Sequence, residues 1–348
     1  MSQTEERTPE ISLVIPAFNA SAHIVECLDH VFASKFKKFE TILVDDCSTD
    51  DTLVKVRGYP CRTLKNETHG GAAHSRNRGI TAAQTDLILL IDSDVLIPPD
   101  FISRVRNYFV DRPDISILQA CYDHKPYYQN LLSQYKHYVF SFRGAHPGGT
   151  YVSYVHTACV AIRREISNQI RFNENLSRRE DIDFGLRCSE NGFRICADPS
   201  LVVRHKKRYT FASYSKYQFK AAKELMIQQL VLKNKNFTQE LSLKKQPFYK
   251  KAWLLRPVLC VLAVLSLILF GLTKNVFWGF LFILVTISSF LLEYQFRWYL
   301  LRVAPLSVSL GAWPLYFYDG FLLGLGGVIG TLQALFRKTS TYGNHSNE

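Results

Sequence analysis

Two carboxylates one residue apart, Asp92 and Asp94, follow an uncharged apolar run at residues 87–91. Such a run predicts a buried strand, and the side chains beyond its end face a cleft. Carboxylates at that place are best satisfied by a divalent cation, and a hard cation with open positions is suited to binding a diphosphate. A single Asp-x-Asp pair is common in solvated loops, so the other motifs of the chain decide its meaning.

Polar groups also follow two earlier predicted strands. Apolar runs at residues 11–15 and 41–44 predict buried strands separated by a helix. The residues at their ends are Pro16, Asn19, Asp45 and Asp46. Strands that alternate with helices predict an α/β fold with a mostly parallel, doubly wound sheet and helices on both faces. Ligands of such sheets bind beyond the carboxyl ends of the strands, where all these groups fall.

A glycine-rich stretch at residues 70–79 lies between the second and third of these strand ends. Its small residues let the backbone approach a ligand, and Arg76 or Arg78 could meet a phosphate, although an ordinary loop and surface helix would have the same composition. Predicted strands follow at residues 116–122 and 158–162, and then the acidic pair Glu180 and Asp181.

Five motifs in this order resemble the family 2 glycosyltransferases with the GT-A fold. They are Val14–Asn19, Val44–Asp50, Ser75–Gly79, Asp92–Asp94 and Arg179–Asp181. Each motif is degenerate alone, but five in the right order are specific. The resemblance implies a GT-A domain that takes a sugar from a nucleotide-diphosphate sugar, with uridine as the default base.

The resemblance also implies roles for individual residues. The nucleotide would be held by Pro16, Ala17, Asn19, Asp45, Asp46, Arg76, Asp92 and Ser93. Asp94 would bind Mn²⁺ or Mg²⁺ directly with Asp92 beside it, and the cation would offset charge on the departing diphosphate. His205, at the end of a predicted strand, would be a further metal ligand, although a histidine beside a basic run is often structural. His156 is a weaker candidate.

The acidic pair resembles the general base of the family. One carboxylate would accept the proton of the acceptor hydroxyl as its oxygen attacks the anomeric carbon, and a single displacement inverts that centre. Ser177 and Glu180 match a capping box, which would leave Glu180 to start a helix and Asp181 to act as the base. Asp183 would point to another face of that helix. Glu180 remains the second candidate.

One motif departs from the family pattern. Processive members carry Q-x-x-R-W after the acidic pair, whereas Gln295-Phe296-Arg297-Trp298 is one residue short and follows two apolar segments. Aromatic and basic anchoring at a membrane interface explains it better. Transfer of a single sugar to a lipid-linked or membrane-proximal glycan acceptor is therefore favoured over chain polymerisation.

The C-terminal part of the chain carries long apolar segments. Residues 253–272 and 276–292 are almost free of charge, and each approaches the length that a helix needs to cross about 30 Å of hydrocarbon. Two buried core helices are the alternative. A third apolar segment at residues 303–336 is expected to break at Pro305 and Pro314 into two short passes or a re-entrant hairpin. An even number of crossings would keep the flanking positive charges inside.

The net charge of +12 comes from one part of the chain. Residues 204–256 hold 14 Lys or Arg and 2 Asp or Glu, and the rest is balanced. A basic stretch that runs into a spanning helix is typical of a cytoplasmic flank near anionic membrane lipids, so nucleic acid is not the expected partner. Within it, a helix is predicted to lie on the membrane surface or to pack on the globular domain.

These patterns predict a membrane-anchored protein with a cytosolic catalytic domain. The expected parts are a polar tail (1–10), the GT-A domain (11–210), a basic juxtamembrane segment (211–251), a membrane region (252–338) and a second tail (339–348). The eight scattered cysteines and the polar N-terminus favour the cytoplasmic face, for example of a bacterial inner or plasma membrane.

Two other functions compete with this hypothesis. A non-catalytic, membrane-anchored nucleotide-sugar-binding partner subunit would be expected to lack the metal or base carboxylate, and both are present. A nucleotidyltransferase would carry a glycine-rich phosphate loop directly after the first strand, where this chain has Pro16–Asn19. An enzyme is therefore favoured over a binding subunit.

Overall fold

The chain folds into two compact units. The computed structural model describes residues 8–144, 150–176, 178–231, 252–292 and 294–342. The first unit consists of residues 1–127 and 144–207, and the second of residues 128–143 and 208–348. Residues 128–143, which the sequence analysis places inside the GT-A domain, therefore group with the helical second unit.

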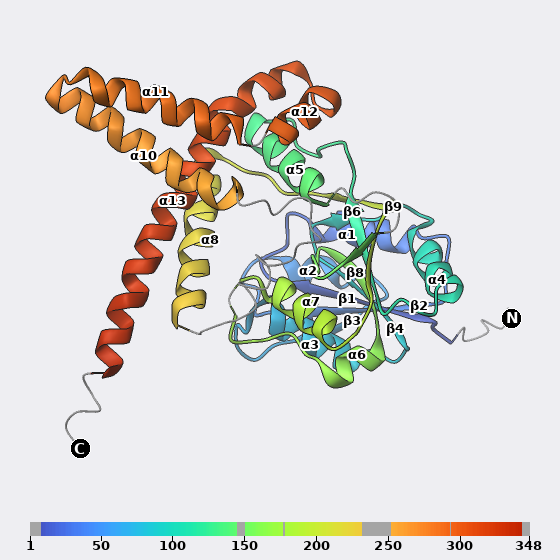
Figure 1. Cartoon of the computed structure of the whole chain (residues 1–348). Helices are drawn as coiled ribbons and strands as arrows, with labels where there is room; N and C mark the ends of the chain where they lie inside the picture. Colours follow the sequence, from blue (N-terminus) through green and yellow to red (C-terminus); the bar gives the residue numbers. More distant parts are fainter. Residues whose placement is uncertain (1–7, 145–149, 177, 232–251, 293, 343–348) are drawn as a thin grey trace, which may run out of the picture. The chain divides into compact units, whose positions relative to one another are not determined.

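Among its described residues, the first unit contains one sheet of nine strands (Figure 1). They are β1 (Ile11–Ala17), β2 (Phe39–Asp45), β3 (Arg62–Lys65), β4 (Leu87–Ile91), β5 (Val95–Leu96), β6 (Ile117–Tyr122), β7 (Thr150–Val152), β8 (Cys159–Arg163) and β9 (Ile195–His205). Their order is β3-β2-β1-β4-β8-β6-β9-β5, and β7 pairs with β9. The neighbouring strands β3, β2, β1 and β4 run parallel, whereas β8 lies antiparallel between β4 and β6.

Helices cover both faces of this sheet. They are α1 (Ile24–Phe32), α2 (Thr52–Val56), α3 (Gly71–Ala82), α4 (Phe101–Asp111), α6 (Arg164–Gln169) and α7 (Glu180–Glu190). Leu13 and Ile15 of β1 join the apolar cluster that includes residues of α1 and α4, whereas Val14 joins the cluster that includes residues of α3 and α7. Because side chains alternate along a strand, a strand buried on both faces is apolar throughout.

The structure confirms the predicted strands and their helical connections. The antiparallel direction of β8 and the short strands β5 and β7 were not predicted. The reason is that strand direction depends on partners distant in the chain, and a strand of two or three residues leaves no periodic pattern in the sequence.

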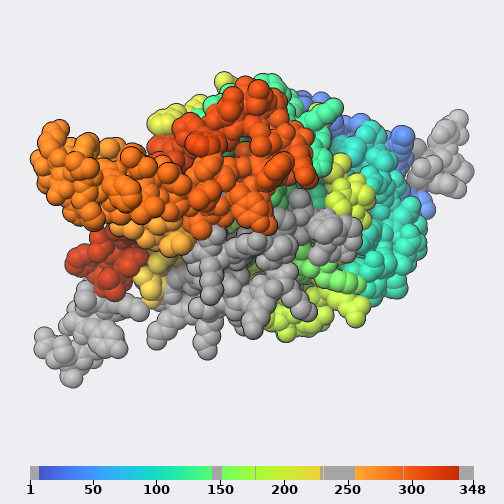
Figure 2. All heavy atoms as spheres, turned by 45° about the horizontal axis from the view of Figure 1, so that its top comes forward, coloured from blue at the N-terminus to red at the C-terminus, as the bar shows by residue number. Residues whose placement is uncertain are grey.

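The second unit is helical where it is described. Its helices are α5 (Leu131–Gly144), α8 (Phe211–Val231), α10 (Ala252–Thr273), α11 (Val276–Leu291), α12 (Tyr294–Val303) and α13 (Leu306–Tyr342). Two stretches are long and apolar enough to cross a membrane, Leu255–Thr273 and Leu306–Phe336, or three if α11 and α12 form one bent span. α10 and α11 run side by side as the orange hairpin of Figure 1, and their atoms are the orange spheres of Figure 2. Their exposed side chains include Leu262, Leu265, Ile268, Phe280, Ile283 and Ile287, which suit hydrocarbon.

Two details of the predicted membrane region are corrected. The segment at 303–336 does not divide at Pro314, because α13 is one helix of 37 residues with this proline inside it. Proline is tolerated within an apolar helix when neighbouring groups compensate for the lost hydrogen bond. The predicted second crossing forms α11, whose 16 residues rise only about 24 Å, too little to cross the hydrocarbon alone.

The predicted juxtamembrane helix, α8, packs along α13. A side chain at Gly326 would collide with the backbone of Phe219, and one at Gly330 with the backbone of Lys223, so these glycines allow close packing of the two helices. Tyr214 on the packed face is fully buried. The sequence analysis offered the membrane surface or the globular domain as partners of this face and missed α13. Residues 232–251 of the predicted segment lie outside the described residues.

A buried polar cluster joins four helices of the second unit. Arg256 Nη2 lies 2.8 Å from Asp319 Oδ2, and the two side chains are 2% and 4% exposed. The Tyr214 hydroxyl and the Gln218 amide both donate to Asp319 Oδ1. Lys136 Nζ donates to Gln218 Oε1 at 2.9 Å. Asp319 is thus the central acceptor between α8, α10 and α13, and Lys136 extends the cluster to α5.

Candidate active site

The predicted nucleotide-binding residues lie at the ends of β1 and β2. Pro16 and Ala17 belong to β1 and pair in register with Val44 and Asp45 of β2. Asp46 N donates to Ala17 O at 2.8 Å, so the ladder continues into the loop. Asp45 is fully buried, and its Oδ1 has no hydrogen-bond partner within the described part of the chain. An acceptor left open in this way favours a ligand or ordered water nearby.

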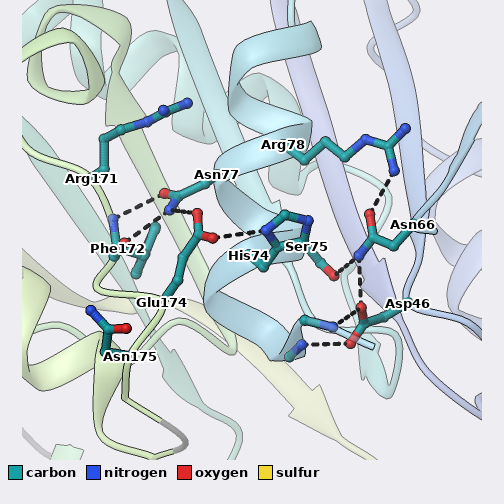
Figure 3. A network of polar contacts seen from close by, with 12 residues as sticks. Asp46, Asn66, His74, Ser75, Asn77, Arg78, Arg171, Phe172, Glu174 and Asn175 are labelled. Carbon is teal, nitrogen blue, oxygen red and sulfur yellow. Dashed lines mark hydrogen bonds and ion pairs between the residues drawn. The ribbon is translucent and has the colours of Figure 1, made fainter. Parts of the chain in front are cut away.

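Asp46 organises the start of α3, as Figure 3 shows. Its two carboxylate oxygens accept from the backbone N–H groups of Gly70 and Gly71 at 2.9 and 2.8 Å, and from Asn66 Nδ2 at 2.7 Å. His69 Nδ1 lies 2.9 Å from Oδ2. A carboxylate at a helix N-terminus satisfies unpaired N–H groups and complements the helix dipole. Asp46 therefore has a structural task, and its predicted contact with the nucleotide stays a prediction.

An exposed aromatic ring that the sequence analysis missed lies beside Asp46. Phe18 is 48% exposed, and its ring centroid is 4.2 Å from that of His69. The neighbouring Asn19 has a φ of 48°, and its amide oxygen accepts from Thr49 N at 2.8 Å. Asn19 thus braces the loop rather than pointing freely into the cleft. A bulky apolar residue directly after a strand was the sequence signal for this ring.

The Asp-x-Asp motif lies in the turn between β4 and β5, with Ser93 at its centre. β5 pairs antiparallel with the end of β9, which aligns Val95 with His205. As a result, His205 Nε2 lies 3.1 Å from Asp94 Oδ1. Burial opposes ionisation of Asp94, but His205 and the nearby Lys207 outweigh it and hold the pKa of the carboxyl below its usual range. The structure thus brings together two of the three predicted metal ligands, Asp94 and His205.

These residues fit a divalent cation that is shared with a substrate. Among the described residues, no three or more His, Cys, Asp or Glu side chains gather around a metal-sized point. Asp94 and His205 supply one ionised carboxylate and one imidazole, and the remaining positions suit diphosphate oxygens and water. Asp92 is less available because its Oδ1 accepts from Arg76 Nη2 at 2.8 Å.

Arg76 connects the Asp-x-Asp turn to the acidic pair. Its side chain is 4% exposed, and its Nη1 donates to Glu180 Oε1 at 2.8 Å while Nη2 donates to Asp92. Three residues along α3, a side chain on Gly79 would overlap Val14 of β1, so the helix lies directly on the sheet. Arg76 thus holds Asp92 and Glu180 apart at a fixed spacing. Its predicted contact with the nucleotide stays a prediction.

Helix α7 presents the acidic pair. It begins at Glu180 after Arg179, which has a left-handed φ of 63°, a strained conformation often found at functional sites. The expected capping box is wrong because Glu180 is the first helical residue and not the third, and its carboxylate also binds Arg76. Ser177 lies outside the described residues. Asp183 points elsewhere and pairs with Arg187 at 2.7 Å.

The two acids differ in their electrostatics. Burial, followed by the charge of Asp181, raises the pKa of Glu180 despite Arg76. Burial also acts against ionisation of Asp181, but His156 and Arg76 reverse it and lower the pKa of that carboxyl. Neighbouring carboxylates with pKa values pushed in opposite directions are typical of acid–base sites. The geometry leaves Asp181 ionised and Glu180 occupied by Arg76.

Residues 12–171 match the sequence model of glycosyl transferase family 2. This part of the chain is a family 2 glycosyltransferase domain. Glycosyltransferase GlyG of Streptococcus pneumoniae is 35% identical over 100 residues, which are 27% of this chain and 33% of GlyG. The amylovoran biosynthesis glycosyltransferase AmsB of Erwinia amylovora is 28% identical over 204 residues, 53% of this chain and 65% of AmsB.

The first three curated relatives are matched over 33% to 65% of their own length. Among solved structures, the mannosyltransferase PcManGT from Pyrobaculum calidifontis, in complex with GDP-Man and Mn²⁺, has a TM-score of 0.54 at 15% identity. The comparison covers 95% of this chain and 88% of PcManGT. At this identity the likeness concerns the fold alone, and it confirms the GT-A architecture of the family 2 domain.

Proposed function

We propose that this protein transfers one sugar from a nucleotide-diphosphate sugar to a lipid-linked or membrane-proximal glycan acceptor, with inversion of the anomeric centre. The observation that carries the proposal is the placement of Asp94 with His205 and of Asp181 with Glu180 in one unit. The buried Arg76 bonds to Glu180 and to Asp92, two residues before Asp94. Such a site holds a cation-binding carboxylate and an ionised base together, which transfer from a diphosphate donor requires.

In the proposed step, the acceptor hydroxyl oxygen attacks the anomeric carbon. Its proton passes to the Asp181 carboxylate, and the bond from the anomeric carbon to the diphosphate oxygen breaks with its electron pair on the departing nucleoside diphosphate. When bound at Asp94 and His205, Mn²⁺ or Mg²⁺ supplies positive charge beside that diphosphate. Arg76 keeps Glu180 hydrogen-bonded and separate from the proton transfer.

Several features support the choice of substrates. PcManGT was solved with GDP-Man and Mn²⁺, and TarS of Staphylococcus aureus, 35% identical over 116 residues that are 31% of this chain and 20% of TarS, is a poly(ribitol-phosphate) beta-N-acetylglucosaminyltransferase. AmsB and the succinoglycan biosynthesis protein ExoO of Rhizobium meliloti carry names from polysaccharide synthesis. We therefore expect a UDP- or GDP-sugar donor, an acceptor in cell-surface polysaccharide or glycolipid synthesis, and a catalytic domain on the cytoplasmic face.

Nucleotide binding tests the donor site directly. Thermal stability of the detergent-purified chain would be measured with UDP, GDP, CDP and dTDP, each with and without Mn²⁺. We expect one nucleotide to raise the melting temperature only with Mn²⁺, and Asp94→Ala to abolish that shift, because a bound ligand stabilises by mass action. Asp100→Ala, an exposed acid on the same unit, is the control. Well-folded protein that responds to none of the nucleotides would favour the non-catalytic partner subunit.

The exposed ring of Phe18 is proposed to stack on the nucleobase. We expect Phe18→Ala to weaken binding of the nucleotide by about 1–3 kcal/mol, because a base loses its aromatic partner. Titration calorimetry with the nucleotide from the thermal screen would measure this loss. Val54→Ala removes a similarly exposed apolar side chain from α2 and should leave the affinity unchanged. Equal affinity in the Phe18 variant would place the base elsewhere.

A further inference from the structure

His156 has no part in the proton and cation chemistry assigned above. It lies between β7 and β8, and its ring nitrogen Nδ1 is 3.8 Å from Asp181 Oδ2. The two side chains are 29% and 23% exposed, so both reach the surface of the site. The sequence analysis considered His156 only as a weak metal ligand. In the structure it faces the proposed base instead of Asp94.

A hydrogen bond and the close packing of a helix position the segment that carries His156. The His156 N–H donates to Oε1 of Gln119 at 2.6 Å, and Gln119 is a buried residue of β6. On α7, a side chain at Gly185 would collide with the backbone of Tyr154 and Val155. Only glycine therefore lets α7 lie against the segment that carries His156.

Gly185 also fixes Asp181 relative to His156. Gly185 and Asp181 are four positions apart on α7, so they lie on the same face of the helix, one turn from each other. The turn of α7 at Gly185 thus packs on Tyr154 and Val155, and the turn before it presents Asp181 to His156. The pair is built by the packing of α7 and not by the chance approach of two surface side chains.

Besides His156, the charged side chains of Arg76 and Glu180 act on Asp181. His156, in the segment before β8, and Arg76, on α3, both act on Asp181, and Glu180 precedes Asp181 on α7. The ring of Tyr154 lies edge-on to His156 at a centroid distance of 5.0 Å. His156 and Arg76 both oppose the effect of burial on the Asp181 carboxyl. Arg76 binds Glu180 and Asp92, and the Ile182 N–H donates to Asp181 Oδ1 at 2.8 Å. His156 is the side chain that faces the other oxygen of Asp181, Oδ2.

We propose that His156 is a positioning residue for Asp181, holding the carboxylate in one orientation and favouring its ionised form. This inference rests on the proposed function, in which Asp181 takes the proton of the attacking hydroxyl. The imidazole makes no bond to substrate in this role. It limits the rotation of the Asp181 side chain, so that a carboxylate oxygen is already in place when the acceptor arrives.

The test compares His156→Ala and His156→Asn with the unaltered full-length chain. The amide nitrogen of Asn takes the place of Nδ1, so this variant keeps a donor at the contact. Turnover would be followed as release of nucleoside diphosphate from whichever of UDP-glucose, UDP-N-acetylglucosamine or GDP-mannose the protein cleaves, over a range of pH. The thermal shift with the matching nucleotide and Mn²⁺ reports folding and donor binding in each variant.

We expect His156→Ala to lower kcat by about 10-fold or more while KM for the donor changes less than about twofold, as for a group that acts only through the base. The acid limb of the kcat profile should move to higher pH. Loss of His156 raises the pKa of Asp181, so the base becomes protonated at a higher pH as the pH is lowered. His156→Asn should regain most of the lost kcat. His74→Ala, which removes an exposed histidine paired with Glu174, is the control.

Three contrary results can be told apart. A kcat and an acid limb equal to those of the unaltered protein in His156→Ala, in a chain that Asp181→Asn inactivates, would overturn the positioning role alone. Full turnover in Asp181→Asn would instead overturn the proposed base and with it this inference. A fall in kcat for His156→Ala without any movement of the acid limb, and equally in His156→Asn, would indicate a structural role and also overturn the proposal.

Discussion

Asp181→Asn is expected to lower turnover by about 10²- to 10⁴-fold, the contribution that a positioned general base usually makes. Asparagine has the size and hydrogen-bonding oxygen of aspartate but does not take up the acceptor proton. The nucleotide-induced thermal shift should stay as in the unaltered protein, because the donor site at Asp94 is not touched. Release of nucleoside diphosphate from the donor, measured at saturating donor, gives the change in kcat.

Two variants on α7 sharpen this test. Glu180→Gln keeps a carbonyl oxygen for Arg76 and should cost less turnover than Asp181→Asn. Glu190→Gln removes an exposed acid at the end of the same helix and should have no effect. A larger loss in Glu180→Gln than in Asp181→Asn would transfer the role of base to Glu180.

Asp319→Ala is expected to destabilise the second unit by about 3–5 kcal/mol, since it removes the carboxylate from a buried ion pair. Arg256 would keep its charge at a position that is 2% exposed, and Tyr214 and Gln218 would lose their shared acceptor. Thermal unfolding of the detergent-purified chain would show the loss as a large fall in melting temperature. The response of the folded protein to nucleotide should remain.

The control is an ion pair in the same unit whose lysine is exposed. Lys220 Nζ lies 3.5 Å from Glu224 Oε1 one turn along α8, and the Lys220 side chain is 54% exposed. Lys220→Ala should change stability by about 0.5 kcal/mol or less, the usual contribution of an i,i+4 helical pair whose cation is solvated. The double variant Arg256→Leu with Asp319→Leu should recover part of the loss, because no buried charge then stands alone. An Asp319→Ala protein as stable as the Lys220→Ala protein would contradict the central role of Asp319.

Much of the first unit could be predicted because its signals are local. Apolar runs such as residues 87–91 give strands buried on both faces, and the acids that follow them must fall at the ligand-binding edge. The position of His205 was predicted by the same argument, since it ends a predicted strand. What could not be predicted was that β5 and β9 pair in a register that aligns Val95 with His205 and so brings Asp94 to the imidazole.

The roles of individual side chains were less predictable. Arg76 and Asp46 are polar residues at expected positions, yet both are buried and engaged by other parts of the chain. Glu180 matched a capping box by spacing, but Arg179 takes the left-handed conformation and the helix begins at Glu180, two residues later than that box requires. A motif fixes which groups are near a site. It does not fix which of their partners, protein or ligand, they bind.

The sequence by itself determined the family 2 domain, the acids at its strand ends and the apolar helices of the second half. These follow from residue type and periodicity along the chain. Only the tertiary structure decided that His156 faces Asp181, that α8 packs on α13 and that Asp319 binds Arg256. Each of these contacts joins residues far apart in the sequence, and two of them depend on glycines whose missing side chains allow close packing. Contacts of this kind arise from packing and leave no periodic pattern.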